Sequence, residues 1–207
     1  LAEETAGKKV EGVLPVSHIM TALETFLKKG GSRSPVIAVK TILDLMQSDV
    51  KRYAGMNIPP LESHTASDDK TGSTGDIEFK DGDEGFEGYE IKHNIKISES
   101  IVLIACDKIR KKPMSRYVIL TTSKVVIEPE EEKEVKEAID KIYEDAGCEV
   151  IVDNVQDFVY SNLRLTQNPI EFMNKFGENL ADDHERNGSF NRQQIELWQT
   201  IIEKFKK

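Results

Sequence analysis

The residues best suited to chemistry alternate with apolar residues in two short segments, 76–79 (Asp-Ile-Glu-Phe) and 89–92 (Tyr-Glu-Ile-Lys). Successive side chains of a strand point to opposite faces, so the ionisable residues share one face when the apolar ones join the core. That set is Asp76, Glu78, Glu90 and Lys92. Carboxylates held close together repel one another, which raises their proton affinity unless a cation lies between them.

Carboxylate oxygens suit Mg²⁺, which keeps several waters and takes one or two protein carboxylates. A lysine two residues from such a ligand can orient or deprotonate the attacking water, or stabilise charge that develops on a phosphate. The combination predicts a site that hydrolyses a phosphodiester. The alternative is a solvated hairpin face whose ion pairs contribute little free energy. Glu-x-Lys alone is weak support, because it recurs at 78–80, 131–133 and 134–136.

The elements before and within this region predict helices followed by a hairpin. Helical periodicity runs over 16–29 and stops at two glycines, and a second helix begins at Ser34-Pro35. The segment 55–75 lacks periodicity and is typical of a long loop. The two alternating segments then form a β-hairpin, with 81–88 as its turn.

The elements after the hairpin predict alternating helices and strands. A helix starts near Ser98 and ends before Pro113, and another starts at about Pro129 and stops at Gly147. Segments 117–122 and 148–152 are apolar runs typical of buried strands. We therefore expect an α/β fold, with a mixed central sheet of a hairpin plus two buried strands, flanked by helices.

The expected domain organisation has three parts. Residues 1–15 form a flexible N-terminal segment, and residues 16–153 form the core together with the N-terminal helices. Residues 154–207 form a helical C-terminal extension packed on the core, in which Phe190 and Trp198 belong to the core or to a dimer contact.

Composition restricts the class of protein. Among 207 residues, 28 are Lys or Arg and 37 are Asp or Glu, which gives a net charge of −9. This acidity argues against binding nucleic acid through bulk positive charge, although it allows a local site. No apolar run reaches the roughly 20 residues of a membrane span, and no segment resembles a signal peptide. Cys106 and Cys148 lie in apolar stretches, as expected of buried thiols. We expect a cytoplasmic protein without membrane contact, from a bacterium or archaeon.

The order of D-x-E-x, hairpin turn, E-I-K, helix, strand, helix and strand resembles the PD-(D/E)XK nuclease superfamily. Within it, the likeness is strongest to type II restriction endonucleases. It rests on Gly75-Asp76 and Glu90-Ile91-Lys92 with the helix and strand that follow, and it covers roughly residues 60–153. Gly75 departs from the motif, which has proline there. The resemblance implies a restriction-endonuclease-like core.

The resemblance also implies roles for particular residues. Asp76 and Glu90 would bind metal, the Ile91 carbonyl would supply a further oxygen, and Lys92 would assist the attacking water. Glu62 and Glu78 are candidates for an additional acid. The implied cofactor is Mg²⁺, with Mn²⁺ as a substitute.

The implied function is cleavage of double-stranded DNA at a short specific sequence, within a restriction-modification system. The implied partners are a second copy of the chain in a homodimer and a cognate DNA methyltransferase. Two alternatives stay open: a structure-specific repair or recombination nuclease of the same fold, and a catalytically inactive DNA- or protein-binding module. Because the site is acidic, we expect weak DNA binding by the free protein without a divalent ion.

Candidate DNA contacts lie in turns and loops next to the predicted strands and helices. They are Ser32, Arg33, Ser73, Thr74, Asn94 and Lys96. Ser32 and Arg33 enter a helix N-terminus, where backbone N–H groups can bind phosphate. A plain connection between two helices is the alternative for this turn. A denser basic cluster consists of Lys108, Arg110, Lys111, Lys112 and Arg116. A surface that follows the phosphate backbone and an ordinary charged helix end both account for it.

Overall fold

The computed structural model describes residues 9–62 and 74–205, which form two compact units. The helical unit comprises the described residues up to Ala54, Glu62, and the chain from Val159 onward. The sheet unit comprises Gly55–Leu61 and the described residues from Thr74 to Phe158. The N-terminal helices therefore group with the C-terminal helices, whereas the sequence analysis placed them with the sheet.

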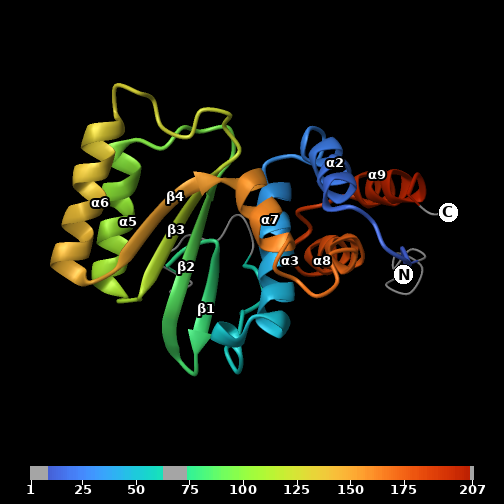
Figure 1. Cartoon of the computed structure of the whole chain (residues 1–207), viewed down its shortest axis with the longest axis horizontal. Helices are drawn as coiled ribbons and strands as arrows, with labels where there is room; N and C mark the ends of the chain where they lie inside the picture. The colour runs from blue at the N-terminus through green and yellow to red at the C-terminus, as the bar shows by residue number, and fades with distance from the viewer. Residues whose placement is uncertain (1–8, 63–73, 206–207) are drawn as a thin grey trace. The chain divides into compact units, whose positions relative to one another are not determined.

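Four strands of the described chain form one mixed sheet in the order β1-β2-β3-β4 (Figure 1). They are β1 (Ile77–Asp81), β2 (Glu84–Lys92), β3 (Arg116–Thr121) and β4 (Glu149–Asn154). β1 and β2 pair antiparallel, whereas β2 with β3 and β3 with β4 pair parallel. The predicted α/β class and mixed sheet are confirmed.

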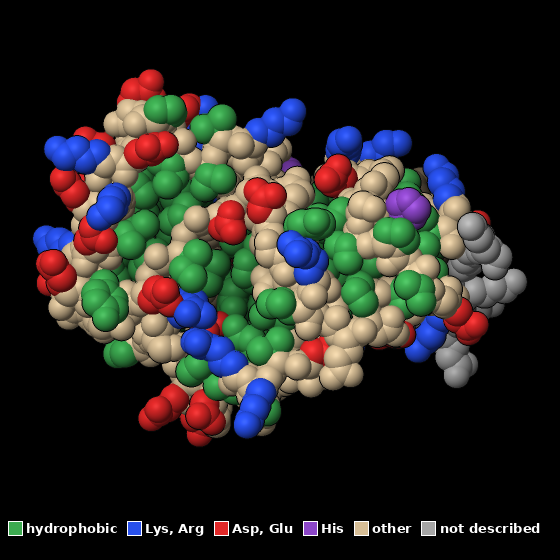
Figure 2. Space-filling view, in the orientation of Figure 1, with side chains coloured by type: hydrophobic (Ala, Val, Ile, Leu, Met, Phe, Trp, Pro, Cys, Tyr) green, Lys and Arg blue, Asp and Glu red, His purple; other side chains and the backbone are tan. Residues whose placement is uncertain are grey.

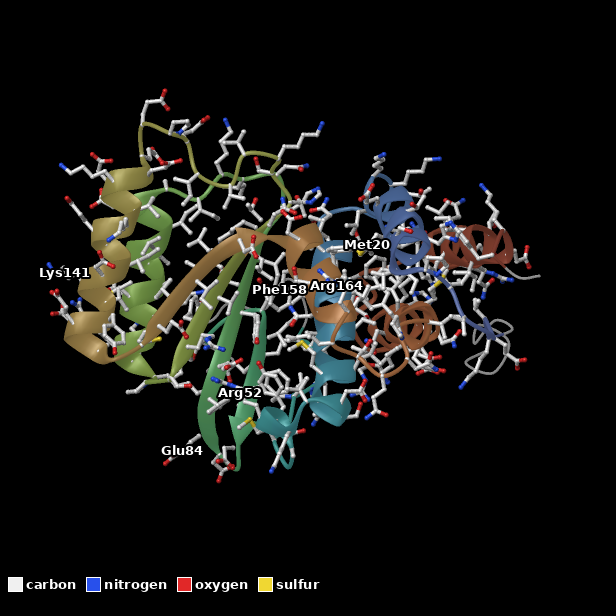
Figure 3. All side chains as sticks on the ribbon, in the orientation of Figure 1. Met20, Arg52, Glu84, Lys141, Phe158 and Arg164 are labelled. Atoms are coloured by element: carbon white, nitrogen blue, oxygen red, sulfur yellow. The ribbon has the colours of Figure 1, made fainter. Side chains whose placement is uncertain are left out.

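Helices α5 (Glu99–Lys111) and α6 (Glu132–Ala146) connect the parallel strands and lie on one face of the sheet (Figure 1). Val102, Ala105 and Ile109 on α5 and Val135, Ala138 and Ile142 on α6 pack with Tyr117, Ile119 and Val150 in one core cluster. The apolar stripes of α5 and α6 thus pack on the apolar side chains that alternate along β3 and β4. Lys141 on α6 and Glu84 at the hairpin end point away from this core (Figure 3).

The opposite face of the sheet carries the other set of alternating residues. Ile77, Phe79, Tyr89, Val118 and Leu120 are all buried, with exposed fractions of 8% or less. The ring of Tyr89 meets those of Phe79 and Phe158 edge-on, with centroids 6.4 and 5.9 Å apart. Both faces of the central strands therefore carry buried apolar side chains.

Two sequence predictions about the strands are corrected. The predicted turn 81–88 is too long, because β2 already starts at Glu84 and Gly82 takes a left-handed φ of +60° that permits a tight turn. The strand predicted as buried at 148–152 is the edge strand β4. Within the described part of the chain it pairs only with β3, and residues 151–154 are only half-buried.

The helical unit contains α2 (Val16–Leu27), α3 (Ser34–Asp49), the 3₁₀ turn η1 (Lys51–Tyr53), α8 (Glu171–Asn187) and α9 (Arg192–Glu203). α7 (Val155–Leu163) follows β4 directly, and the boundary between the units falls within it. The rings of Phe26, Phe176 and Trp198 form the centre of the unit, with centroids 4.5–5.6 Å apart. Trp198 and Phe190 are each 1% exposed, so both belong to the core.

The helices found in residues 9–62 and 74–205 include none with the length and apolar character that crossing a membrane requires.

The entry into β1 tolerates only glycine without rearrangement. A Cβ at Gly75 would lie 2.6 Å from the backbone oxygen of Tyr89, and backbone cannot yield as a flexible side chain can. A proline ring at position 75 would occupy the same restricted space.

We predict that Gly75→Ala destabilises the protein by about 1–3 kcal/mol, the usual cost of overpacking. Gly85→Ala is the matched control in the same hairpin, because its Cβ would meet neighbours at 3.5 Å or more. Urea denaturation of both variants measures the difference. Equal stability of the two variants would show that the close approach at position 75 is not restrictive.

Candidate functional site

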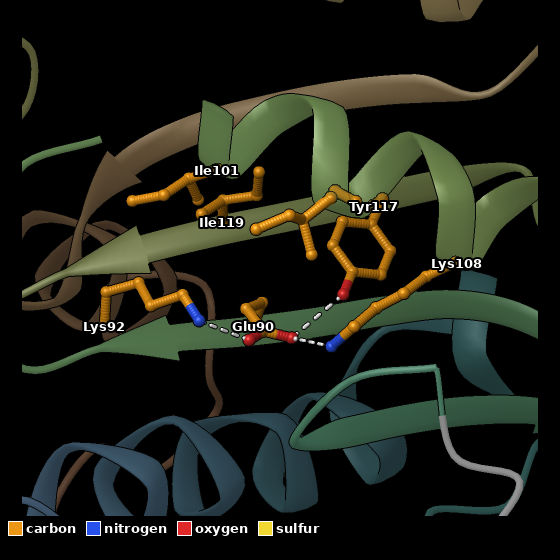
Figure 4. Close-up of a pocket in the computed structure, with 8 residues that line it drawn as sticks. Glu90, Lys92, Ile101, Lys108, Tyr117 and Ile119 are labelled. Carbon is orange, nitrogen blue, oxygen red and sulfur yellow. Dashed lines mark hydrogen bonds and ion pairs between the residues drawn. The ribbon is translucent and has the colours of Figure 1, made fainter. Parts of the chain in front are cut away.

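The Glu90 carboxylate is the centre of the candidate site. Glu90 lies in β2 opposite Ile119 of β3, so its side chain is on the sheet face that α5 covers. Lys92 Nζ donates to Glu90 Oε1 at 2.6 Å, and Lys108 Nζ donates to Oε2 at 2.9 Å. Figure 4 shows the two lysines approaching the carboxylate from opposite sides.

Tyr117 adds a third group, which a glycine on the neighbouring strand admits. Gly88 lies opposite Tyr117, and a Cβ at position 88 would be 2.9 Å from the Tyr117 ring. The Tyr117 hydroxyl lies 3.0 Å from Glu90 Oε2 and 2.8 Å from the Thr74 carbonyl oxygen. The two oxygens are both acceptors, and they share the one proton that the hydroxyl can donate. Tyr117 therefore links Glu90 to the segment that leads into Asp76.

The β1–β2 register brings the predicted site residues together. Ile77 pairs with Tyr89, and continuing that antiparallel register by one step sets Asp76 opposite Glu90. Asp76 Oδ2 accepts a hydrogen bond from the backbone N–H of Ile91 at 2.7 Å. Asp76, Glu90, Ile91 and Lys92 are thus neighbours at one end of the hairpin.

The protonation state of Glu90 follows from its surroundings. Burial alone would raise the pKa of this carboxyl, but the charges and hydrogen bonds of Lys108 and Lys92 outweigh burial and lower it. Glu90 is therefore ionised at neutral pH, the form that a metal ligand requires.

Glu78 forms a second and more enclosed ion pair on the same face. Its oxygens accept hydrogen bonds from Lys112 Nζ at 2.7 and 3.0 Å and from the Thr74 N–H at 2.6 Å. Lys80 Nζ lies 3.7 Å away. Burial raises the pKa of Glu78, and the bonds from Lys112 and Thr74 more than reverse this, so its pKa is lowered. These contacts fix Glu78 as an anchor between β1 and the end of α5.

The donors at the Asp76–Glu90 end fit a hard cation by their chemistry. Two carboxylates and a backbone carbonyl are all oxygen ligands, and Mg²⁺ takes one or two carboxylates with waters. No cluster of three or more His, Cys, Asp or Glu side chains arranged for a metal occurs in residues 9–62 and 74–205. The fit therefore depends on two acids and on water, and both oxygens of Glu90 already accept hydrogen bonds from lysine.

A small pocket opens beside these groups. Its charged part is formed by Glu90, Lys92 and Lys108, and its apolar part by side chains of α5 and β3 (Figure 4). Its volume is about 30 Å³, enough for at least one water-sized group. Ile104 on its rim is 58% exposed. The carboxylate is thus accessible from solvent on one side.

Several predicted DNA contacts have structural partners within their own unit. Arg33 is 6% exposed and pairs with Asp183 at 2.9 Å, while it also donates to the Glu62 carbonyl oxygen at 2.7 Å. Lys96 forms an ion pair with Glu128. Asn94 takes a left-handed φ of 56° and donates its N–H to Thr122 Oγ1. Contact with DNA by Arg33 would require its buried pair with Asp183 to open.

The other candidates are placed as follows. Ser32 is exposed, and Thr74 is buried with its backbone bonded to Glu78 and Tyr117. Ser73 lies outside the described residues. Glu62 is exposed and belongs to the helical unit, so its role as an additional acid stays a prediction.

Most of the basic cluster neutralises nearby acids. Lys108 and Lys112 pair with Glu90 and Glu78, and Arg110 pairs with Asp145 and Asp107. Arg116 bridges Glu87 and Glu149, its register partners on the two neighbouring strands. Figure 2 shows acidic and basic side chains intermixed on the visible face. These pairings favour a charged helix end over a continuous phosphate-binding surface.

The sequence analysis did not assign Lys108 and Tyr117 to the site. A partial signal existed for Lys108, which follows Ala105 by three residues and so lies near the buried face of α5. Tyr117 had none, because its role depends on Gly88 in the neighbouring strand.

The sequence matches no protein-family model, and a search of curated proteins gives no match.

We predict that Lys112→Met lowers the free energy of unfolding by about 1–3 kcal/mol, because it leaves the buried Glu78 carboxylate without its main cation. Methionine keeps most of the apolar part of the side chain, so the loss of stability measures the contribution of the ammonium group. The control is Lys111→Met on the same helix, where the side chain is exposed and the effect should stay within about 0.5 kcal/mol. Urea denaturation compares them, and equal losses would refute the anchoring role of Glu78.

Acid should destabilise the protein through the same carboxylates. The folded pKa values of Glu78 and Glu90 are lowered below 4.5, so their contribution to stability is present above the unfolded pKa and is lost as pH falls through the folded values. We expect the free energy of unfolding to decrease as the pH is lowered below about 4.5. Glu78→Gln should make this fall shallower in urea denaturation series at stepped pH. An unchanged slope would contradict the assignment.

Proposed function

We propose that this protein is a metal-dependent endodeoxyribonuclease of the PD-(D/E)XK type that hydrolyses phosphodiester bonds in double-stranded DNA. The observation that carries the proposal is the convergence of Asp76, Glu90 and Lys92 at one end of the β1–β2 hairpin. Asp76 lies at the register position opposite Glu90, and Lys92 donates to Glu90 at 2.6 Å. These are the residue types, order and spacing of the superfamily motif.

The arrangement of secondary structure also supports the proposal. The antiparallel β1–β2 pair is followed by α5, the parallel strand β3, α6 and the parallel strand β4. This is the element order on which the resemblance was based. The glycine at position 75, the one departure noted in the motif, fits a restricted space and leaves the acids in place.

Each residue of the site has a role in the proposal. Asp76, Glu90 and the Ile91 carbonyl would hold Mg²⁺ or Mn²⁺, which when bound would polarise the scissile phosphate and the attacking water. Lys92, held by Glu90 as an ammonium group, would orient that water and stabilise the negative charge that develops on the phosphate. Tyr117 would keep the Glu90 carboxylate oriented, because its hydroxyl joins Glu90 to the Thr74 carbonyl.

Specific cleavage of a short sequence, a homodimer and a cognate methyltransferase belong to the same proposal as its finer part. A two-fold dimer would match a palindromic site, because protein symmetry mirrors site symmetry. The restriction-endonuclease-like core is proposed from the order of helices and strands described above.

We predict that the protein with Mg²⁺ cuts a phage genome into discrete fragments. Asp76→Asn, Glu90→Gln and Lys92→Ala should each reduce the cleavage rate at least about 100-fold, the usual contribution of acid–base groups and of charge stabilisation. Lys80→Ala is the matched control, because Lys80 belongs to the other Glu-x-Lys of the hairpin. It should cut at the wild-type rate.

Circular dichroism and thermal unfolding would first establish that each variant folds. Cleavage of branched DNA alone would favour the repair or recombination nuclease. If the folded protein cuts neither substrate with Mg²⁺ or Mn²⁺, the nuclease proposal is refuted and the catalytically inactive binding module is favoured. Wild-type activity of a folded Lys92→Ala variant would refute the site assignment.

A further inference from the structure

Lys108 is a second lysine on Glu90 that the catalytic motif does not include. It extends from α5, and its Nζ lies 2.9 Å from Glu90 Oε2, while Lys92 holds Oε1. The Lys108 and Glu90 side chains are 20% and 15% exposed, so their attraction is only partly screened by water. Both oxygens of a metal-ligand candidate are thus already occupied by ammonium groups.

This pairing changes the electrostatics that a metal ion would meet. Lys92 and Lys108 both bind Glu90, and Asp76 lies at the register position beside it, so the formal charges of these four side chains sum to zero. A divalent cation would be attracted far more weakly here than by two carboxylates without lysines. A phosphodiester brings an additional negative charge, which would favour the metal and give a displaced lysine a new partner.

The comparison with Lys112 shows why Lys108 is suited to exchange partners. Glu78, the partner of Lys112, is enclosed at 4% exposure and also bound by the Thr74 N–H. Glu90 instead borders the pocket that Lys108 and Lys92 help to line. Lysine carries three donors on a flexible stem, so Lys108 can turn from one oxygen partner to another with little cost.

We propose that Lys108 is a resident counter-cation of the site. In the free protein it competes with a divalent metal ion for Glu90, and it moves to a phosphate oxygen when metal and DNA are bound together. The proposal rests on the proposed function, because it takes Glu90 as a metal ligand. It implies that metal and DNA increase each other's affinity, since such coupling is reciprocal.

Calorimetric titration of the free protein with Mn²⁺ tests the competition without any cleavage assay. Lys108→Met should bind Mn²⁺ at least about tenfold more tightly than the wild type, the size of effect expected from removing one adjacent charge. Lys108→Arg keeps the charge and should retain the wild-type affinity. Lys111→Met, an exposed lysine on the same helix, should not change it.

The two hypotheses fail in different ways. If Glu90→Gln abolishes Mn²⁺ binding while Lys108→Met leaves the affinity unchanged or weaker, Glu90 is a ligand and the counter-cation role of Lys108 is refuted. If neither the wild type nor Lys108→Met binds Mn²⁺, the proposed function fails and the counter-cation role fails with it.

Binding of random-sequence duplex DNA, measured with and without Ca²⁺, tests the transfer to phosphate. The Ca²⁺-dependent gain in DNA affinity should be smaller for Lys108→Met than for the wild type and for Lys111→Met. An equal gain in all three proteins would overturn this part of the proposal.

Discussion

The packing of α5 against the acidic face of the hairpin is the constraint on which the rest of the site depends. It encloses the carboxylates of Glu78 and Glu90, and enclosed charges are costly unless they are paired and hydrogen-bonded. α5 itself supplies Lys108, and its C-terminal end supplies Lys112. The same packing thus creates the electrostatic cost and offsets it, and it leaves Glu90 the more accessible of the two acids.

Alternation and periodicity predicted much of the fold. The two apolar–polar segments became β1 and the end of β2, and the apolar run at 117–122 became the buried strand β3. The end of α6 at Gly147 was also predicted, because glycine readily takes the left-handed backbone conformation that ends many helices. Gly147 has this conformation, with a φ of +65°. The errors came from tertiary context. β4 is half-buried because no strand in residues 9–62 and 74–205 other than β3 pairs with it, and β2 extends into the predicted turn.

The site was predicted in its residues more than in its surroundings. Strand alternation put Asp76, Glu90 and Lys92 together, and the observed register agrees. Residue spacing did not reveal that α5 covers this face, because the face on which a helix lies depends on how its side chains pack against the sheet. Lys108 and Tyr117 therefore entered the site only through the structure. The net charge of −9 is likewise clarified: the densest basic cluster mostly pairs with acids.

The central claim is that the Asp76–Glu90 end of the hairpin binds a divalent metal ion. Anomalous diffraction from crystals soaked in Mn²⁺ with a short duplex tests it most directly. We predict an anomalous peak bounded by the carboxylates of Asp76 and Glu90, with Lys108 turned away from Glu90. Diffraction that places Lys108 on Glu90, with no peak beside either acid at saturating Mn²⁺, would contradict the account.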